Sequence, residues 1–82
     1  LSNPLDVNFM IYPNPANDYI NLKSESIIYG YTIYDIKGSL ILEKINNNSN
    51  YLNISLKNIY SGIYFLEIKS GIHKKTVKFI KK

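Results

Sequence analysis

Turn-forming residues interrupt this chain at short intervals, and the runs between them carry the pattern of β-strands. Proline, glycine, asparagine and aspartate bound apolar runs that are shorter than a typical helix. In residues 18–23, and again in residues 51–56, apolar and polar side chains alternate, which is the pattern of a strand buried on one face. We therefore expect short strands joined by tight turns, with Ile20, Leu22 and Ile54 pointing inward.

Composition supports the same class of fold. Isoleucine and tyrosine are abundant, and Ala16 is the only alanine, so the best helix former is nearly missing while residues that suit a pleated surface are common. Seven runs with strand character are spaced as in a sandwich or barrel. We predict an all-β domain, a seven-stranded antiparallel Ig-like β-sandwich. The expected strands cover residues 9–12, 18–23, 31–36, 39–45, 51–56, 62–69 and 73–81.

Two prolines and one aspartate-to-glycine segment give the most specific turn predictions. Pro13 and Pro15 remove two backbone donors, so the first strand cannot continue beyond Tyr12. Asp35 and Gly38 fit the first and last positions of a type I turn, whose glycine starts a bulged hairpin. Both segments are expected to end a strand and reverse the chain.

Other segments are predicted as connections or as the entry to a strand. Residues 24–30 and the asparagine-rich residues 46–50 interrupt the strand pattern, so we expect a connection and a loop there. Leu56 is expected to anchor the end of one strand. Gly62 would then allow a sharp entry into the strand that contains Tyr64, which we predict to be central and covered on both faces near its start.

The positive charge of the chain comes only from lysine. The net charge is +4 and arginine, which contacts guanine edges and phosphates bidentately, is absent, so sequence-specific nucleic-acid binding is disfavoured. Six of the ten lysines lie in residues 69–82, including Lys78, Lys81 and Lys82. They are interpreted as the solvated face of an edge strand, where lysine prevents aggregation. A phosphate- or lipid-binding patch is the other interpretation.

No combination of residues indicates catalysis or a metal site. The chain has no cysteine, His73 is its only histidine, and its six carboxylates lack metal-ligand spacing. No apolar run approaches the ~20 residues needed to span a bilayer. Without tryptophan, the eight tyrosines are expected to pack rather than to form a stacking surface for sugars or bases. We predict a domain that is not an enzyme, with no cofactor, metal, nucleic-acid partner or membrane span.

Four segments occur in an order that resembles a known family. They are residues 11–18, 34–38, 56–65 and 76–82. Together they resemble the type A C-terminal sorting domain of the type IX secretion system of Bacteroidetes, over nearly all of residues 9–82. The resemblance implies a C-terminal secretion signal instead of a reaction. The candidate recognition residues that match its motifs are Pro13, Asn14, Pro15, Asp18, Asp35, Gly38, Leu56, Gly62, Tyr64, Lys78, Lys81 and Lys82.

The resemblance also implies partners and a route. A cargo domain N-terminal in the same chain would reach the periplasm by a separate signal, and the outer-membrane type IX translocon would then recognise the folded tail. A surface peptidase would remove the tail, in some systems attaching the cargo to lipopolysaccharide, so the cargo would be secreted or held at the cell surface.

The beginning of the chain agrees with a tail cut from a longer protein. It opens with neither an initiator methionine nor a signal peptide. Residues 1–8 are predicted to be a linker to the upstream cargo domain, with the cleaved bond in or before it, and residues 9–82 to be the sorting domain. The alternative function is an accessory carbohydrate-binding or adhesion module of a secreted enzyme.

Overall fold

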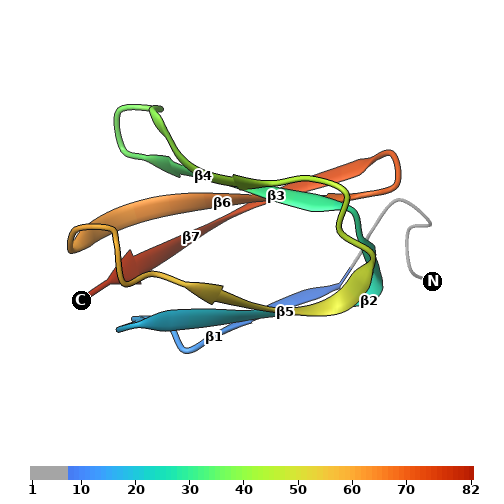
Figure 1. The fold of residues 1–82 in the computed structure, drawn as a ribbon, viewed down its shortest axis with the longest axis horizontal. Helices are drawn as coiled ribbons and strands as arrows, with labels where there is room; N and C mark the ends of the chain where they lie inside the picture. Colours follow the sequence, from blue (N-terminus) through green and yellow to red (C-terminus); the bar gives the residue numbers. More distant parts are fainter. Residues whose placement is uncertain (1–7) are drawn as a thin grey trace.

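The computed structural model describes residues 8–82, which form two stacked antiparallel sheets (Figure 1). The three-stranded sheet, in the order β1-β2-β5, consists of β1 Phe9–Tyr12, β2 Tyr19–Ile28 and β5 Ser49–Ser55. The four-stranded sheet, in the order β4-β3-β6-β7, consists of β3 Gly30–Asp35, β4 Leu40–Lys44, β6 Gly62–Ser70 and β7 His73–Lys81. Every pairing between these strands is antiparallel. The prediction of an all-β, seven-stranded Ig-like sandwich is confirmed.

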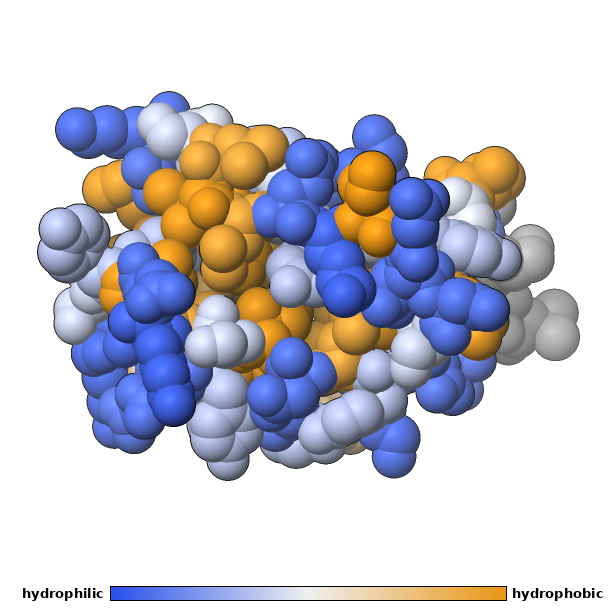
Figure 2. All heavy atoms as spheres, viewed as in Figure 1, coloured by the Kyte–Doolittle hydropathy of each residue, from blue (hydrophilic) through white to orange (hydrophobic). Residues whose placement is uncertain are grey.

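The hydrophobic core fills the space between the two sheets. Ile20, Leu22, Ile54 and Leu56 are buried, as the alternation predicted, and Leu52 is half-buried. A fully buried side chain of this size contributes about 1.5–3 kcal/mol relative to an exposed one. Apolar surface also remains visible between the sheets from the side seen in Figure 2. The buried hydrophobic residues are Ala16, Ile20, Leu22, Ile28, Ile33, Ile54, Leu56, Tyr64, Leu66, Ile68 and Phe79.

The connection predicted over residues 24–30 is wrong. β2 continues to Ile28 and β3 begins at Gly30, with an irregular register between Lys23 and Ile28. The polar residues of this stretch concealed the strand, because they lack apolar alternation. Gly30 packs so closely on β4 that an added Cβ would lie 2.6 Å from the carbonyl oxygen of Lys44. The glycine therefore permits close approach of two strands instead of marking a loop.

The asparagine-rich loop predicted over residues 46–50 is shorter than expected, because β5 begins at Ser49. Asn46 has a left-handed backbone (φ 58°), which asparagine tolerates better than most residues. The Asn47 side chain donates a 2.7 Å hydrogen bond to the carbonyl of Ile28. The loop is thus tied to the end of β2.

The predicted hairpin turn at Asp35–Gly38 is confirmed. The Gly38 N–H donates to the Asp35 carbonyl at 3.0 Å, and Gly38 has a φ of 85°, a conformation that favours glycine. The Asp35 carboxylate accepts hydrogen bonds from the N–H groups of Lys37 and Ser39, both at 2.9 Å. A register shift between Ile33 and the following residue shows the expected bulge.

The position of β6 was predicted in part. It is central, between β3 and β7, and β7 is an edge strand as expected. Coverage on both faces is wrong, because Ile63 is exposed and Phe65 is only half-buried. No element within residues 8–82 packs on the outer face of the four-stranded sheet. That face meets solvent.

Candidate recognition site

The Pro13–Asn14–Pro15 segment crosses from the three-stranded sheet to the outer edge of β7. The Asn14 side chain donates a 3.2 Å hydrogen bond to the carbonyl of Lys78 and accepts a 3.0 Å bond from the N–H of Ile80. Its amide therefore occupies the place of a peptide group in a neighbouring strand. Pro13 and Pro15 are exposed on either side, and the peptide bonds that precede them are both cis.

Ala16 continues this contact with its backbone. Its N–H donates to the carbonyl of Ile80 at 2.7 Å, and its carbonyl accepts from the N–H of Lys82 at 2.8 Å. The result is a short parallel bridge between Ala16 and Lys81. The Ala16 side chain is fully buried, so a larger residue there would overpack the core. We call the hydrogen bonds of Asn14 and Ala16 to β7 the Asn14–Ala16 clamp.

The clamp joins segments that are far apart in the sequence. The two bonds of Asn14 span 64 and 66 residues. A side chain that pairs with a strand edge blocks the addition of another strand at that point. β7 is the edge strand of its sheet, but its last part is already paired with Asn14 and Ala16.

The Leu56–Tyr64 segment supports β7 from the core side. Leu56 is buried, and its N–H donates to the carbonyl of Asp18 at 2.8 Å. Gly62, with a φ of 155°, pairs with Lys81. Two residues later the Tyr64 ring stacks on Phe79 of β7, with centroids 5.7 Å apart. The segment therefore fixes both the register and the packing of the last strand.

Tyr64 is anchored at its polar end as well. Its hydroxyl donates a 2.6 Å hydrogen bond to the carbonyl of Tyr60, so a ring that is almost fully buried has its polar atom satisfied. Asp18, in contrast, is exposed and contributes its backbone carbonyl. Any role of the Asp18 carboxylate in recognition stays a prediction.

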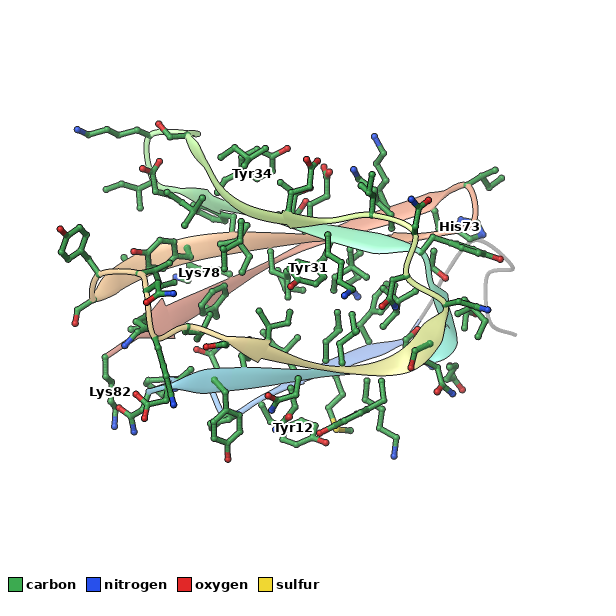
Figure 3. The ribbon with its side chains drawn as sticks, in the orientation of Figure 1. Tyr12, Tyr31, Tyr34, His73, Lys78 and Lys82 are labelled. Atoms are coloured by element: carbon green, nitrogen blue, oxygen red, sulfur yellow. The ribbon has the colours of Figure 1, made fainter. Side chains whose placement is uncertain are left out.

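The four motif segments converge on one end of the four-stranded sheet. Asp35 pairs with Tyr64, and Tyr64 pairs with Phe79, so the hairpin turn at Gly38 lies at the same end as the final residues of the chain. Figure 1 shows the β3–β4 hairpin, the β5–β6 loop and the C-terminus at this end. Lys82 lies there in Figure 3, whereas His73 lies at the other end.

The three C-terminal candidate lysines differ in their surroundings. Lys78 and Lys82 are exposed, whereas Lys81 is half-buried, and its ammonium group donates a 3.0 Å hydrogen bond to the carbonyl of Lys82. Inward-facing Phe79 alternates with outward-facing Lys78 and Ile80. The predicted solvated lysine face is consistent with this alternation.

The described residues show few features associated with catalysis. Residues 8–82 contain no group of three or more histidine or acidic side chains that could hold a metal ion. No helix suited to crossing a membrane occurs in this part of the chain. Burial raises the pKa of the Tyr31 hydroxyl, which lies inside the sandwich (Figure 3).

A surface depression of about 340 Å³ lies along β1 and β2. It is lined by Asn8, Phe9, Met10, Lys23, Ser24 and Glu25. None of the candidate recognition residues lines it. The residues that match the motifs therefore position strands at the other end of the sandwich.

The fold defines this chain as an Ig-like β-sandwich domain, and its motif residues hold the last strand in place. The family model of the secretion system C-terminal sorting domain matches residues 10–82. The chain belongs to this family, which indicates a C-terminal sorting signal of the type IX secretion system. A search of the curated proteins found no match.

A solved structure has a similar fold. It is that of PorZ, described as an essential bacterial surface component of the type IX secretion system of Porphyromonas gingivalis. The TM-score is 0.69 with 16% sequence identity, over 92% of this chain and 11% of that chain. The likeness shows the fold, and this chain corresponds to a small part of the length of PorZ.

Sequence reasoning missed three residues of the site. Ala16 and Ile80 provide backbone partners in the clamp, and Phe79 supports Tyr64. The available signal was the single alanine directly after the second proline, because a lone small residue can mark a tightly packed position. The identity of its partner could not be deduced from that signal.

Proposed function

We propose that this domain directs an attached cargo protein through the type IX secretion system and is recognised in its folded form. The family match over residues 10–82 carries this proposal, because it includes every motif segment. The Asn14–Ala16 clamp supports recognition of a folded signal, since it joins the first motif to the last strand. In this proposal the domain itself catalyses nothing.

The recognised surface is the end where the motifs meet. Pro13, Asn14 and Pro15 lie exposed beside Lys78 and Lys82, and together they present a rigid, positively charged corner. Five other motif residues act indirectly, because they hold the strands that form this corner. They are Leu56, Gly62, Tyr64, Asp35 and Gly38. A translocon component at the outer membrane would contact the exposed prolines, Asn14 and the lysines of the corner, and not the residues that hold its strands.

The later steps follow the family's known route. After the cargo passes through the periplasm and the outer membrane, a surface peptidase removes the tail, releasing the cargo or attaching it to lipopolysaccharide. The predicted linker, residues 1–8, lies almost wholly outside the described residues. The cargo is then secreted or stays at the cell surface.

Export of a reporter tests the main proposal. Residues 1–82 would be fused to a reporter that carries a periplasmic signal peptide, in a host with the type IX machinery. We expect the reporter outside the cell, and we expect it in the periplasm when the machinery is inactivated. A reporter that stays periplasmic while an established sorting domain exports it would rule the function out.

The alternative, a carbohydrate-binding module, has one observation in its favour. Tyr12, Tyr19 and Tyr51 are exposed on the outer face of the three-stranded sheet, around Asn21. The Asn21 side-chain oxygen already accepts bonds from the Tyr51 hydroxyl and from Asn53, both at 2.8 Å. We therefore expect no specific binding. Micromolar, saturable binding to a polysaccharide that one tyrosine substitution abolishes would favour the alternative.

A further inference from the structure

The outer face of the four-stranded sheet is divided into an apolar part and a polar part. In β3 and β6, Tyr34 pairs with Phe65 and Thr32 pairs with Glu67, so these residues share the outer face. Figure 3 shows Tyr34 on the outer side of this sheet, away from Tyr31 in the core. The polar part, around Thr32, lies toward the middle of the sheet, and the apolar part lies at the clamped end.

Strand register defines the apolar part. Leu40 of β4 pairs with Tyr34, Ile63 of β6 pairs with Ile80 of β7, and Phe65 lies two residues from Ile63 on the same face. Leu40, Ile63 and Ile80 are each 40–55% exposed. We call these five residues the outer apolar patch, which consists of Tyr34, Leu40, Ile63, Phe65 and Ile80.

The patch gathers apolar side chains of neighbouring strands on one surface. Large contiguous apolar surfaces on a soluble domain mark interaction sites more often than scattered apolar residues do. Here four neighbouring strands contribute to one surface, beside the Asn14–Ala16 clamp that fixes its edge. Because the clamp and the patch share Ile80, a partner that contacts the motif corner would also reach the patch.

The charges around the patch indicate the chemistry of its partner. Lys78 pairs with Phe65 on this face, and Lys82 lies two residues after Ile80 at the edge. The two carboxylates of the face, Glu43 and Glu67, both lie in the row of Thr32, which borders the patch on the side farther from the clamped end, whereas Lys78 lies in the row of the patch itself. The surface that complements the patch is therefore apolar and carries carboxylates opposite the lysines.

Two other occupants fit less well. A second copy of this chain would bring a second patch that is likewise lined by Lys78 and Lys82, and each copy carries a net charge of +4. An anionic lipid surface would attract the lysines but repel Glu43 and Glu67 on the same face. A protein partner, in contrast, can place carboxylates opposite Lys78 and Lys82 and none opposite Glu43 and Glu67.

We propose that the outer apolar patch docks onto a protein of the export machinery through an apolar, carboxylate-lined surface. This inference rests on the proposed function, because it names the partner surface that the sorting signal contacts. It extends the recognised area from the motif corner to further residues, among them Leu40, which lies outside the motif segments.

Charge insertion tests the apolar contact. Ile63→Glu and, on a different strand, Leu40→Glu are expected to lower the exported fraction of the reporter fusion about tenfold or more, because a buried interface centre tolerates an unpaired charge poorly. Ile45→Glu and Ile72→Glu are matched controls, since these isoleucines are 64% and 90% exposed outside the patch. The controls are expected to export normally. Thermal melts must show that all four variants are folded.

Charge reversal tests the complementary chemistry. Lys78→Glu is expected to reduce export strongly, and Lys78→Arg is expected to retain it. Lys74 pairs with Lys69, away from the patch, so Lys74→Glu is expected to change export little. A general need for positive charge would make Lys74→Glu as harmful as Lys78→Glu. That result would overturn the assignment of carboxylates opposite the patch.

The outcomes separate this inference from the function on which it rests. If the unmodified fusion is not exported, the sorting function fails. If it is exported and folded Ile63→Glu and Leu40→Glu are exported equally well, the docking surface alone is overturned. Dimerisation that Ile63→Glu abolishes, measured by sedimentation, would assign the patch to a second copy. Binding to phosphatidylglycerol vesicles that Ile63→Glu abolishes would assign it to a membrane.

Discussion

The two ends of the sandwich are held by different kinds of contact. At the clamped end, backbone pairing is completed by Asn14 and Ala16 on β7, and Tyr64 stacks on Phe79. At the opposite end, side chains bridge strands that lack a regular register: the Ser70 hydroxyl donates to the carbonyl of Ile27 at 2.7 Å. The first arrangement fixes the position of a strand terminus, whereas the second mainly satisfies buried polar groups.

This difference also explains where the motifs lie. The family's motif residues gather at the clamped end, while the segment over residues 24–30 and the asparagine loop at the opposite end match no motif. A recognition surface requires side chains at fixed positions, so its supporting residues are restricted. The opposite end needs only hydrogen-bond partners for its buried polar groups, and many sequences can supply these. Equal losses of stability at the two ends are therefore expected to have unequal effects on export.

Removal of the last strand is expected to have the largest effect. Deleting residues 73–82 removes β7 and the clamp, takes Phe79 from the core and leaves β6 as an edge. We expect loss of cooperative unfolding by circular dichroism and loss of export. Pro13→Ala, which removes only turn rigidity worth about 1 kcal/mol, is expected to retain most export. Normal export of the truncated chain would show that the last strand is not part of the signal.

A core substitution at the clamped end is expected to lower the stability of the domain less than the deletion does, but still by a large amount. Phe79→Ala leaves a cavity against Tyr64 and should lower the free energy of unfolding by about 3–5 kcal/mol, measured by denaturant titration. The neighbouring Ile80→Ala changes an exposed side chain and should cost well under half as much. Similar losses for the two variants would contradict the described packing of β7.

Local turns were predictable from the sequence, and long-range pairings were not. The Asp35–Gly38 turn was predicted because its hydrogen bonds lie within five residues. Asn14 was recognised as part of a motif, but its bonds to β7 depend on how the two sheets stack, which no local pattern contains. The extension of β2 to Ile28 was missed for the same reason, since its backbone is held by contacts that are distant in the sequence, such as the bond from the Ser70 hydroxyl to the Ile27 carbonyl.

A pair of asparagine variants tests the comparison of the two ends directly. Asn14→Ala and Asn47→Ala each remove side-chain hydrogen bonds to the backbone, so each should lower stability by about 1–2 kcal/mol. Only Asn14→Ala is expected to speed hydrogen exchange at the amide of Ile80 and to reduce export several-fold. Asn14→Asp keeps the acceptor for that amide and loses the donor, so an intermediate exchange rate is expected. Equal export defects in the two alanine variants would mean that stability alone decides export.

The smallest expected effect concerns Thr32, which lies between the two ends. Its hydroxyl is buried on the outer face and has no hydrogen-bond partner within residues 8–82, although Glu43 and Glu67 flank it in the same row. A buried polar group without a partner costs about 1–3 kcal/mol, and valine replaces the hydroxyl by a methyl group of similar size. Thr32→Val should therefore raise the free energy of unfolding by about 1 kcal/mol without changing export. Exposed Thr76, in the same row, is the control, and Thr76→Val should change stability by less than half as much. A loss of stability in Thr32→Val would show that the hydroxyl is hydrogen-bonded to a flanking carboxylate. The polar part of the face would then be a hydrogen-bonded network beside the outer apolar patch.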